Sequence, residues 1–160
     1  MKYLLALVIL LSIPNFVYSQ KIPIVTLQQL QCKIKVKNDT TYVVNFWATW
    51  CAPCVKELPC FDSITSLYKP FPVKVFLVSI DFKEDIETKL IPFLRKKKVQ
   101  SEVLLLNETD ANYFIPQIDT TWTGSIPATL IINTTKDMHR FFEKKISTKL
   151  LQTELEKILK

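Results

Sequence analysis

Glycine is almost absent from this chain of 160 residues, and Gly124 is its only representative. Loops that cradle phosphate groups need several glycines, so a P-loop and a dinucleotide-binding fingerprint are excluded. Histidine is equally scarce, with His139 as the only one. No zinc-protease motif is present. The chain also has no internal repeat and no low-complexity tract. These absences leave an ordinary globular protein without phosphate-binding loops.

The composition is that of one folded domain with a substantial core. Hydrophobic residues make up 48% of the chain and charged residues 22%, which is usual for a globular protein. At this length there is room for one domain rather than two. The net charge is +6, and the densest basic run is Arg95–Lys98. Because no aromatic residues interleave that run, it indicates a solvated face, and we expect no nucleic-acid partner.

The first residues have the pattern of an export signal. Lys2 is followed by an apolar run from Leu4 to Ile13, and Val17-Tyr18-Ser19 resembles a cleavage site. We therefore predict a signal peptide at 1–19, a mature domain at 20–160 and a periplasmic or other extracytoplasmic location. The alternative is an uncleaved membrane anchor, although the run is shorter than the ~20 residues that a spanning helix needs.

Apolar periodicity predicts alternating strands and helices along the rest of the chain. The expected strands are 41–47, 73–80, 102–106, 128–132 and 138–142. The expected helices are 26–36, a long one from 51 to 68 that Pro59 should kink, turns within 84–98 interrupted at Pro92, 109–115, and a last helix capped by Ser147. This alternation predicts an α/β fold with one sheet covered by helices on both faces.

The segment Cys51-Ala52-Pro53-Cys54 lies where the first long strand gives way to a helix. At a helix N-terminus the free N–H groups and the positive end of the dipole stabilise a thiolate, which lowers the pKa of Cys51. Cys54 follows nearly one turn later, within bonding reach and more buried. The pattern predicts that Cys51 attacks a disulfide and Cys54 resolves the mixed disulfide, while Pro53 stiffens the first turn.

Two other interpretations of this cysteine pair remain open. It could be half of a zinc site, although no second ligand pair accompanies it and His139 is expected on the surface. It could also be a purely structural disulfide. The two further cysteines, Cys32 and Cys60, are expected to be small buried hydrophobes. Cys60 lies about 13 Å along the helix from Cys51, too far for an S–S bond between them.

Three motifs follow one another along the chain. The first is Phe46-Trp47-Ala48-Thr49-Trp50-Cys51-Ala52-Pro53-Cys54, continued by Val55-Lys56-Glu57-Leu58-Pro59. The later segments are Val78-Ser79-Ile80-Asp81 and Ser125-Ile126-Pro127-Ala128-Thr129-Leu130. Together they resemble the thioredoxin superfamily, and in particular its TlpA/ResA-like envelope branch, whose active-site segment is similar to the first motif. The resemblance covers roughly residues 41–159. It implies a thioredoxin-like fold, with a central mixed sheet and helices on both faces.

The resemblance also implies how a substrate is held. Pro127 should be a cis proline that faces the disulfide, and the backbone of Ile126 should pair with an extended substrate segment. Trp50, directly before Cys51, and Pro53, between the two cysteines, are expected to contact the substrate as well.

Glu57 matches the acidic residue that the envelope branch places beside the cysteines. Its position one helical turn after Cys54 would let the carboxylate manage the Cys54 proton. The alternative is a solvated helix glutamate. The chain departs from thioredoxins proper at Asn45, where those proteins carry a buried Asp. Because Asn cannot accept a proton, the role would fall to Glu57 or to water.

We therefore expect an exported, monomeric thiol–disulfide oxidoreductase without metal or cofactor. It would reduce disulfides of protein partners through Cys51 and Cys54 and draw electrons from a membrane or envelope donor. The alternatives are a disulfide-forming oxidant and a non-catalytic copper-binding thiol module, against which the lack of nearby Met or His ligands counts. A peroxidase is disfavoured because Thr49 lies two residues before Cys51, not three.

Overall fold

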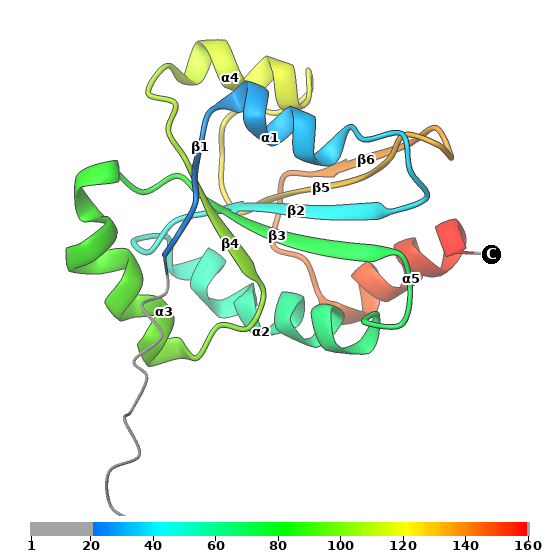
Figure 1. The fold of residues 1–160 in the computed structure, drawn as a ribbon, viewed down its shortest axis with the longest axis horizontal. Coiled ribbons are helices and arrows are strands. Elements are labelled where there is room, and N and C mark those ends of the chain that lie inside the picture. Colours follow the sequence, from blue (N-terminus) through cyan, green and yellow to red (C-terminus); the bar gives the residue numbers. More distant parts are fainter. Residues whose placement is uncertain (1–20, 160) are drawn as a thin grey trace, which may run out of the picture.

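The computed structural model describes residues 21–159, which form one domain around a six-stranded sheet (Figure 1). The predicted signal peptide at 1–19 and the predicted domain start at residue 20 lie outside the described residues. The strands are β1 (Ile24–Val25), β2 (Thr41–Trp47), β3 (Val73–Ser79), β4 (Glu102–Leu106), β5 (Ala128–Asn133) and β6 (Met138–Phe142).

The sheet is mixed, with strand order β1-β4-β3-β2-β5-β6. Strands β1, β4, β3 and β2 are parallel to their neighbours, whereas β5 is antiparallel to β2 and β6 is antiparallel to β5. Because β2, β3 and β4 run parallel, their carboxyl ends lie at the same end of the sheet. The expected central mixed sheet is confirmed.

Helices cover both faces of the sheet, as predicted. They are α1 (Leu27–Ile34), α2 (Ala52–Leu67), α3 (Ile91–Lys97), α4 (Ala111–Ile118) and α5 (Thr148–Leu159). Figure 1 shows α1 and α4 on one side of the sheet and α2, α3 and α5 on the other. Each side encloses its own cluster of buried apolar side chains.

Strand β2 explains why the sheet has two cores. All of its residues are buried, and successive side chains point to opposite faces. Val43 and Trp47 enter the cluster that also contains the two active-site cysteine candidates, while Val44 and Phe46 enter the cluster beneath α1 and α4. The same alternation directs Asn45, between Val44 and Phe46, toward the side of α2.

Several element boundaries differ from the predicted ones, for local reasons. Helix α1 is capped by the Thr26 side chain and ends at Ile34, before the predicted residue 36. Helix α4 is capped by Asp110 and continues to Ile118 rather than stopping at residue 115. Strand β1 was not predicted, because two residues are too short a segment for a periodicity signal. It pairs with β4 and is part of the sheet only through that pairing.

The segment before α3 shows how a proline fits into helical structure. A π-helical turn spans Ile86–Leu90, and α3 begins directly after it, at Ile91. Pro92 lies in the first turn of α3, where no intrahelical N–H donor is needed. The predicted interruption is therefore a change of helical geometry before Pro92. Helix α2, by contrast, contains Pro59 and continues as one helix from Ala52 to Leu67.

The prediction that both extra cysteines are buried is wrong. Cys32 is exposed and Cys60 is half-buried, and neither is in a disulfide. On α1 the buried residues are Leu27, Leu30 and Ile34, so Cys32 falls on the opposite, solvent-facing side of the helix.

None of the helices between residues 21 and 159 is both long and apolar enough to cross a bilayer.

Candidate active site

Cys51 and Cys54 lie just beyond the carboxyl end of β2, at the start of α2, and form a disulfide. The S–S distance is 2.02 Å and the two Cα atoms are 5.3 Å apart. Cys51 is the N-cap residue of α2, and the backbone N–H of Cys54 donates to its Sγ at 3.3 Å. Cys51 is 6% exposed and Cys54 is 0% exposed, which agrees with the predicted asymmetry of the pair. The cysteine at the N-terminus of α2, Cys51, is therefore the more accessible of the two.

The loop before the cysteines is fixed by Asp81, at the end of the neighbouring strand β3. The backbone N–H and the hydroxyl of Thr49 both donate to the Asp81 carboxylate, at 3.0 and 2.6 Å. The Ser79 hydroxyl donates to the same carboxylate at 2.7 Å, and Asp81 is 5% exposed. Asp81 therefore holds the segment that leads into Cys51. Sequence reasoning assigned no role to it, although an acidic residue ending a strand parallel to β2 was the available signal.

The chain returns to the disulfide at Ile126 and Pro127, more than seventy residues later. The Cys51 Sγ atom lies 3.8 Å from the Ile126 carbonyl oxygen. The Ile126–Pro127 peptide bond is cis, as the resemblance implied. Pro127 is buried and Ile126 is half-buried. The structure thus brings Ile126 beside the disulfide, and Pro127 follows it directly in the chain.

Trp50 and Pro53 are both exposed next to the cysteines. Trp50 is 64% exposed, which is unusual for so large an apolar side chain. Pro53 lies in the first turn of α2, where its lack of an N–H group costs nothing. The surface around Cys51 is therefore apolar and accessible.

Glu57 is fully buried beneath the disulfide, one turn along α2 from Cys54. Its Oε1 accepts from the Asn45 Nδ2 at 2.8 Å, and its Oε2 accepts from the backbone N–H of Ile146 at 2.8 Å. Burial raises the pKa of the Glu57 carboxyl above its ordinary value of 4.5, and the hydrogen bonds from Ile146 and Asn45 offset only part of that rise. The interpretation of Glu57 as a solvated helix glutamate is wrong, because its exposure is 0%.

Asn45 and Glu57 form one buried polar cluster rather than two separate features. Besides Glu57, the Asn45 Nδ2 contacts the Thr129 Oγ1 at 3.1 Å and the Ala128 carbonyl at 3.3 Å, both on β5. Sequence reasoning excluded Asn45 as a proton acceptor, left the role to Glu57 or to water, and missed the contact between Asn45 and Glu57. The available signal was that Asn45 points from β2 toward α2, on which Glu57 lies, and that a buried polar group needs a partner.

The remaining titratable side chains do not gather into a second centre. No group of three or more His, Cys, Asp or Glu that could hold a metal ion occurs among residues 21–159. His139 is exposed, as predicted, and its Nε2 lies 2.7 Å from the Asp119 Oδ2.

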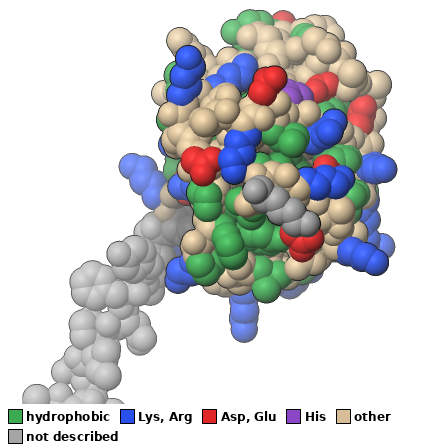
Figure 2. All heavy atoms as spheres, turned by 90° about the vertical axis from the view of Figure 1, so that its right-hand side faces the viewer, with side chains coloured by type: hydrophobic (Ala, Val, Ile, Leu, Met, Phe, Trp, Pro, Cys, Tyr) green, Lys and Arg blue, Asp and Glu red, His purple; other side chains and the backbone are tan. Residues whose placement is uncertain are grey.

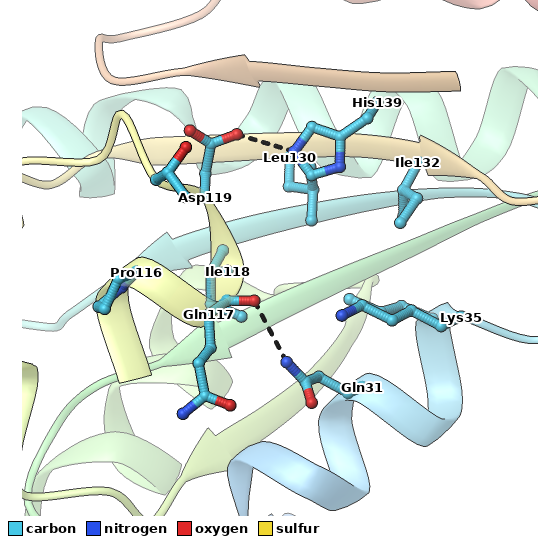
Figure 3. A pocket seen from close by; sticks show the side chains of 11 residues that line it. Gln31, Lys35, Pro116, Gln117, Ile118, Asp119, Leu130, Ile132 and His139 are labelled. Carbon is cyan, nitrogen blue, oxygen red and sulfur yellow. Dashed lines mark hydrogen bonds and ion pairs between the residues drawn. The ribbon is translucent and has the colours of Figure 1, made fainter. Parts of the chain in front are cut away.

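Asp119 and His139 line a separate cavity of about 360 Å³ between α1, α4 and β5 (Figure 3). Neither Cys51 nor Cys54 lines this cavity. Figure 3 shows that Asp119 and His139 bond to each other, and that Gln31 Nε2 donates to the Gln117 carbonyl, at 3.2 Å. These polar groups already have partners, so we assign no function to this cavity.

An apolar surface lies at the opposite end of the sheet. Figure 2 shows hydrophobic side chains gathered there among charged ones. Leu67 and Phe71 are 54% and 52% exposed. The backbone N–H of Thr41, the first residue of β2, donates to the Pro72 carbonyl, at 2.7 Å. This surface is therefore at the amino end of β2, whereas Cys51 follows its carboxyl end.

Comparison with known proteins places the chain among thioredoxin-like proteins. The AhpC/TSA family model matches residues 13–140. The thiol-disulfide oxidoreductase ResA of Oceanobacillus iheyensis is 39% identical over 49 residues, which cover 31% of this chain and 26% of that protein. The sporulation thiol-disulfide oxidoreductase A of Bacillus subtilis is 30% identical over 63 residues, covering 39% and 38%. The matched segments thus span about a quarter to two fifths of these curated relatives.

Solved structures share the fold over most of the chain. A thioredoxin-related protein from Neisseria meningitidis serogroup B superposes with a TM-score of 0.64, at 21% identity and over 91% of each chain. StoA from Bacillus subtilis superposes with a TM-score of 0.56, at 19% identity, over 72% of this chain and 82% of that one. Together these comparisons confirm the thioredoxin-like fold and the resemblance to the ResA-like branch.

Proposed function

Because the chain belongs to the AhpC/TSA family of thioredoxin-like proteins, we propose that it is an extracytoplasmic thiol–disulfide oxidoreductase that reduces disulfides of protein partners. One observation carries the proposal. The Cys51–Cys54 disulfide caps the N-terminus of α2, and the more exposed residue, Cys51, lies beside the Ile126 carbonyl. This arrangement offers a stabilised thiolate and a backbone acceptor at the same place.

The reaction proceeds through a mixed disulfide. The Cys51 thiolate attacks one sulfur of a partner disulfide, so that the partner's S–S bond breaks, an intermolecular S–S bond forms and the second partner sulfur leaves as a thiolate. Cys54 then loses its proton and attacks the Cys51 sulfur. The intramolecular disulfide forms and the partner is released with both cysteines reduced. Two electrons pass from the Cys51–Cys54 pair to the partner.

The loop at Ile126 would align the partner for this attack. An extended peptide can hydrogen-bond to a free backbone edge, which fixes its direction whatever its side chains. The Ile126 carbonyl lies 3.8 Å from the Cys51 sulfur, so a peptide bound there would present its own sulfur to Cys51. The exposed Trp50 and Pro53 would contact apolar groups that flank the partner's cysteine.

Glu57 would accept the Cys54 proton in the second step. Burial raises the pKa of a thiol, so Cys54 needs a proton acceptor close by. Glu57 lies one turn away on the same helix and is equally buried. Its own pKa is raised by burial, which brings the carboxylate closer to the proton affinity that an efficient general base needs near neutral pH.

Export and re-reduction complete the proposal. Residues 1–19 would be removed as a signal peptide, or would remain as an anchor, and the domain would act outside the cytosol. One solved neighbour, from Mycobacterium tuberculosis, is described as a secreted disulfide oxidoreductase. After each turnover the Cys51–Cys54 disulfide needs a reductant, which we assign to a membrane or envelope thiol donor.

Trapping the mixed disulfide tests this function. Cys54→Ser retains the nucleophile and removes the resolving thiol, so the reduced variant should accumulate a covalent complex with a disulfide-bonded protein substrate such as insulin. The matched control Cys51→Ser retains Cys54 and should accumulate none. Equal trapping by the two variants, or trapping by neither, would sink the proposal.

The reduction potential of the wild type tests the direction. A reductant should have a potential near that of thioredoxin, about −270 mV, whereas a disulfide-forming oxidant should lie near −120 mV. The potential can be measured by equilibrating the Cys51–Cys54 disulfide with glutathione or dithiothreitol buffers. A potential of about −120 mV would mean that the protein forms disulfides in its partners rather than reducing them, through the same Cys51–Cys54 site.

A further inference from the structure

The Glu143 carboxylate, at the end of β6, accepts hydrogen bonds from the short loop that precedes Ile126. The backbone N–H of Thr123 donates to Oε2 at 3.0 Å, and the backbone N–H of Ser125 donates to Oε1 at 2.8 Å. The Thr123 hydroxyl donates to Oε1 as well. One side chain thus binds the loop at two positions that bracket Gly124.

This loop has little freedom of its own. Gly124 has a φ of +97°, a backbone conformation that other residues rarely adopt. A Cβ atom there would come within 3.0 Å of the Ile115 side chain, so the backbone runs close against α4. The Trp122 indole N–H donates to the Ser125 carbonyl at 2.9 Å. Glu143 supplies the hydrogen bonds on the remaining, solvent-facing side of the loop.

Glu143 is charged when it binds the loop. The hydrogen bonds from the hydroxyl and the backbone N–H of Thr123 lower the pKa of its carboxyl below the ordinary value of 4.5. A hydrogen bond to an ionised acceptor is shorter and stronger than one between neutral groups. The contacts of Glu143 are therefore stronger than an ordinary contact between a side chain and a turn.

The loop that Glu143 binds leads directly into the site. Ser125, whose N–H donates to the carboxylate, is followed by Ile126, whose carbonyl lies 3.8 Å from the Cys51 sulfur. Displacement of Ser125 would therefore move the Ile126 backbone with it. Glu143 touches neither cysteine.

We propose that Glu143 is a positioning residue that fixes the Ile126 backbone for extended protein substrates and so sets their affinity. The inference rests on the proposed function, because it assigns a determinant of substrate binding to that same site. It predicts an effect on substrates that pair with the Ile126 backbone and none on small disulfides that reach Cys51 without such pairing.

Glu143→Ala and the matched control Glu102→Ala test the proposal. Glu102 is an exposed glutamate on β4 that pairs with Lys74 at 2.9 Å and has no contact with the loop. Each variant is pre-reduced, freed of reductant, and mixed with increasing insulin, or with the small disulfide 5,5′-dithiobis(2-nitrobenzoic acid). Glu143→Ala should raise the half-saturating insulin concentration about five-fold or more, as expected for lost hydrogen bonds to a charged group.

Three further readouts separate positioning from a general loss of structure. The maximal rate with insulin, the rate with the small disulfide and the alkylation rate of Cys51 should stay within about two-fold of wild type. Hydrogen exchange at the amides of Thr123 and Ser125 should accelerate in Glu143→Ala and not in Glu102→Ala. Glu143→Gln, which keeps the shape and one acceptor oxygen, should fall between wild type and Glu143→Ala, and it replaces the alanine variant if that one does not fold.

The outcomes are distinct. An active wild type with an unchanged half-saturating concentration in the folded Glu143 variants overturns the inference and leaves the proposed function standing. An equal loss with insulin and with the small disulfide also overturns it, because Glu143 would then act on the whole site. A wild type inactive toward both disulfides overturns the proposed function, and the inference falls with it.

Discussion

The buried cluster beneath the disulfide and the loop beside it are each organised by one glutamate, under opposite conditions. Glu57 is fully buried, and burial raises the pKa of its carboxyl despite two hydrogen bonds. Glu143 is only partly buried, and hydrogen bonds from Thr123 lower the pKa of its carboxyl. Desolvation therefore outweighs hydrogen bonding at Glu57, whereas hydrogen bonding prevails at Glu143.

The two glutamates are also connected through one short segment. Glu143 ends the β6 hairpin, and three residues later the N–H of Ile146 donates to Glu57. The same four-residue connection therefore binds the loop before Ile126 with a side chain and the buried carboxylate with its backbone. In the proposed function, this connection would hold the proton acceptor Glu57 and the loop before Ile126 in a fixed relation to one disulfide.

Removal of the nucleophile should exceed the effect of either glutamate. Cys51→Ser leaves both carboxylates in place but removes the N-cap sulfur that attacks the partner, so insulin reduction should fall to the rate without enzyme. Turnover with dithiothreitol as donor measures this, and unfolding by urea provides the control for stability. If Cys51→Ser retained a substantial rate, neither glutamate could be serving this disulfide.

The next largest effect is expected from Glu57→Gln. Loss of the proton acceptor should slow resolution of the mixed disulfide about 10-fold or more, the usual size of a lost general base. The alkylation rate of Cys51 should change little, because its thiolate depends on the helix N-terminus. Single-turnover kinetics with pre-reduced protein measure both. An unchanged rate between about pH 6 and pH 9 would mean that another group takes the Cys54 proton.

Combining the two glutamate variants sharpens the comparison further. If Glu57 acts on proton transfer and Glu143 on substrate alignment, their effects on the rate at low insulin should multiply within about two-fold. The measurement compares the double variant Glu57→Gln/Glu143→Ala with each single variant. A double variant no slower than the worse single one would show that both residues act on the same step through the Glu143–Ile146 connection.

The smallest effects are expected in the pH dependence of stability, with opposite signs. The pKa of Glu57 is raised on folding, so its contribution is lost as pH rises above 4.5 and through its folded-state pKa. The pKa of Glu143 is lowered on folding, so its contribution is present above 4.5 and is lost as pH falls through its folded-state pKa. Urea unfolding between about pH 3 and pH 8 resolves the two windows.

Each glutamine variant should change the pH dependence of the unfolding free energy only in the pH range where its own glutamate titrates. Glu57→Gln should reduce the slope of unfolding free energy against pH on the side above 4.5, and Glu143→Gln should reduce it on the side below 4.5. The reverse pattern would mean that the environments of the two carboxyls are exchanged relative to those described.

Prediction from the sequence was accurate where the signal is local. The strands at 41–47, 102–106 and 138–142 were predicted with the boundaries that the structure shows, because their residues alternate or form continuous apolar runs. It failed where a distant partner decides. Strand β1 exists through pairing with β4. The error at Cys32 has a different origin, because the helical spacing of Leu27, Leu30 and Ile34 already places Cys32 on the opposite face of α1.

The sequence by itself determined the cysteine pair, since a CxxC segment between a strand and a helix places Cys51 at a helix N-terminus. Only the tertiary structure decided what surrounds that pair. Asn45 meets Glu57 because β2 packs on α2, and Glu143 reaches residues 123–125 because β6 lies beside β5. Such contacts join residues far apart in the chain, and a hydrogen bond depends on distances of a few ångström that no local pattern encodes.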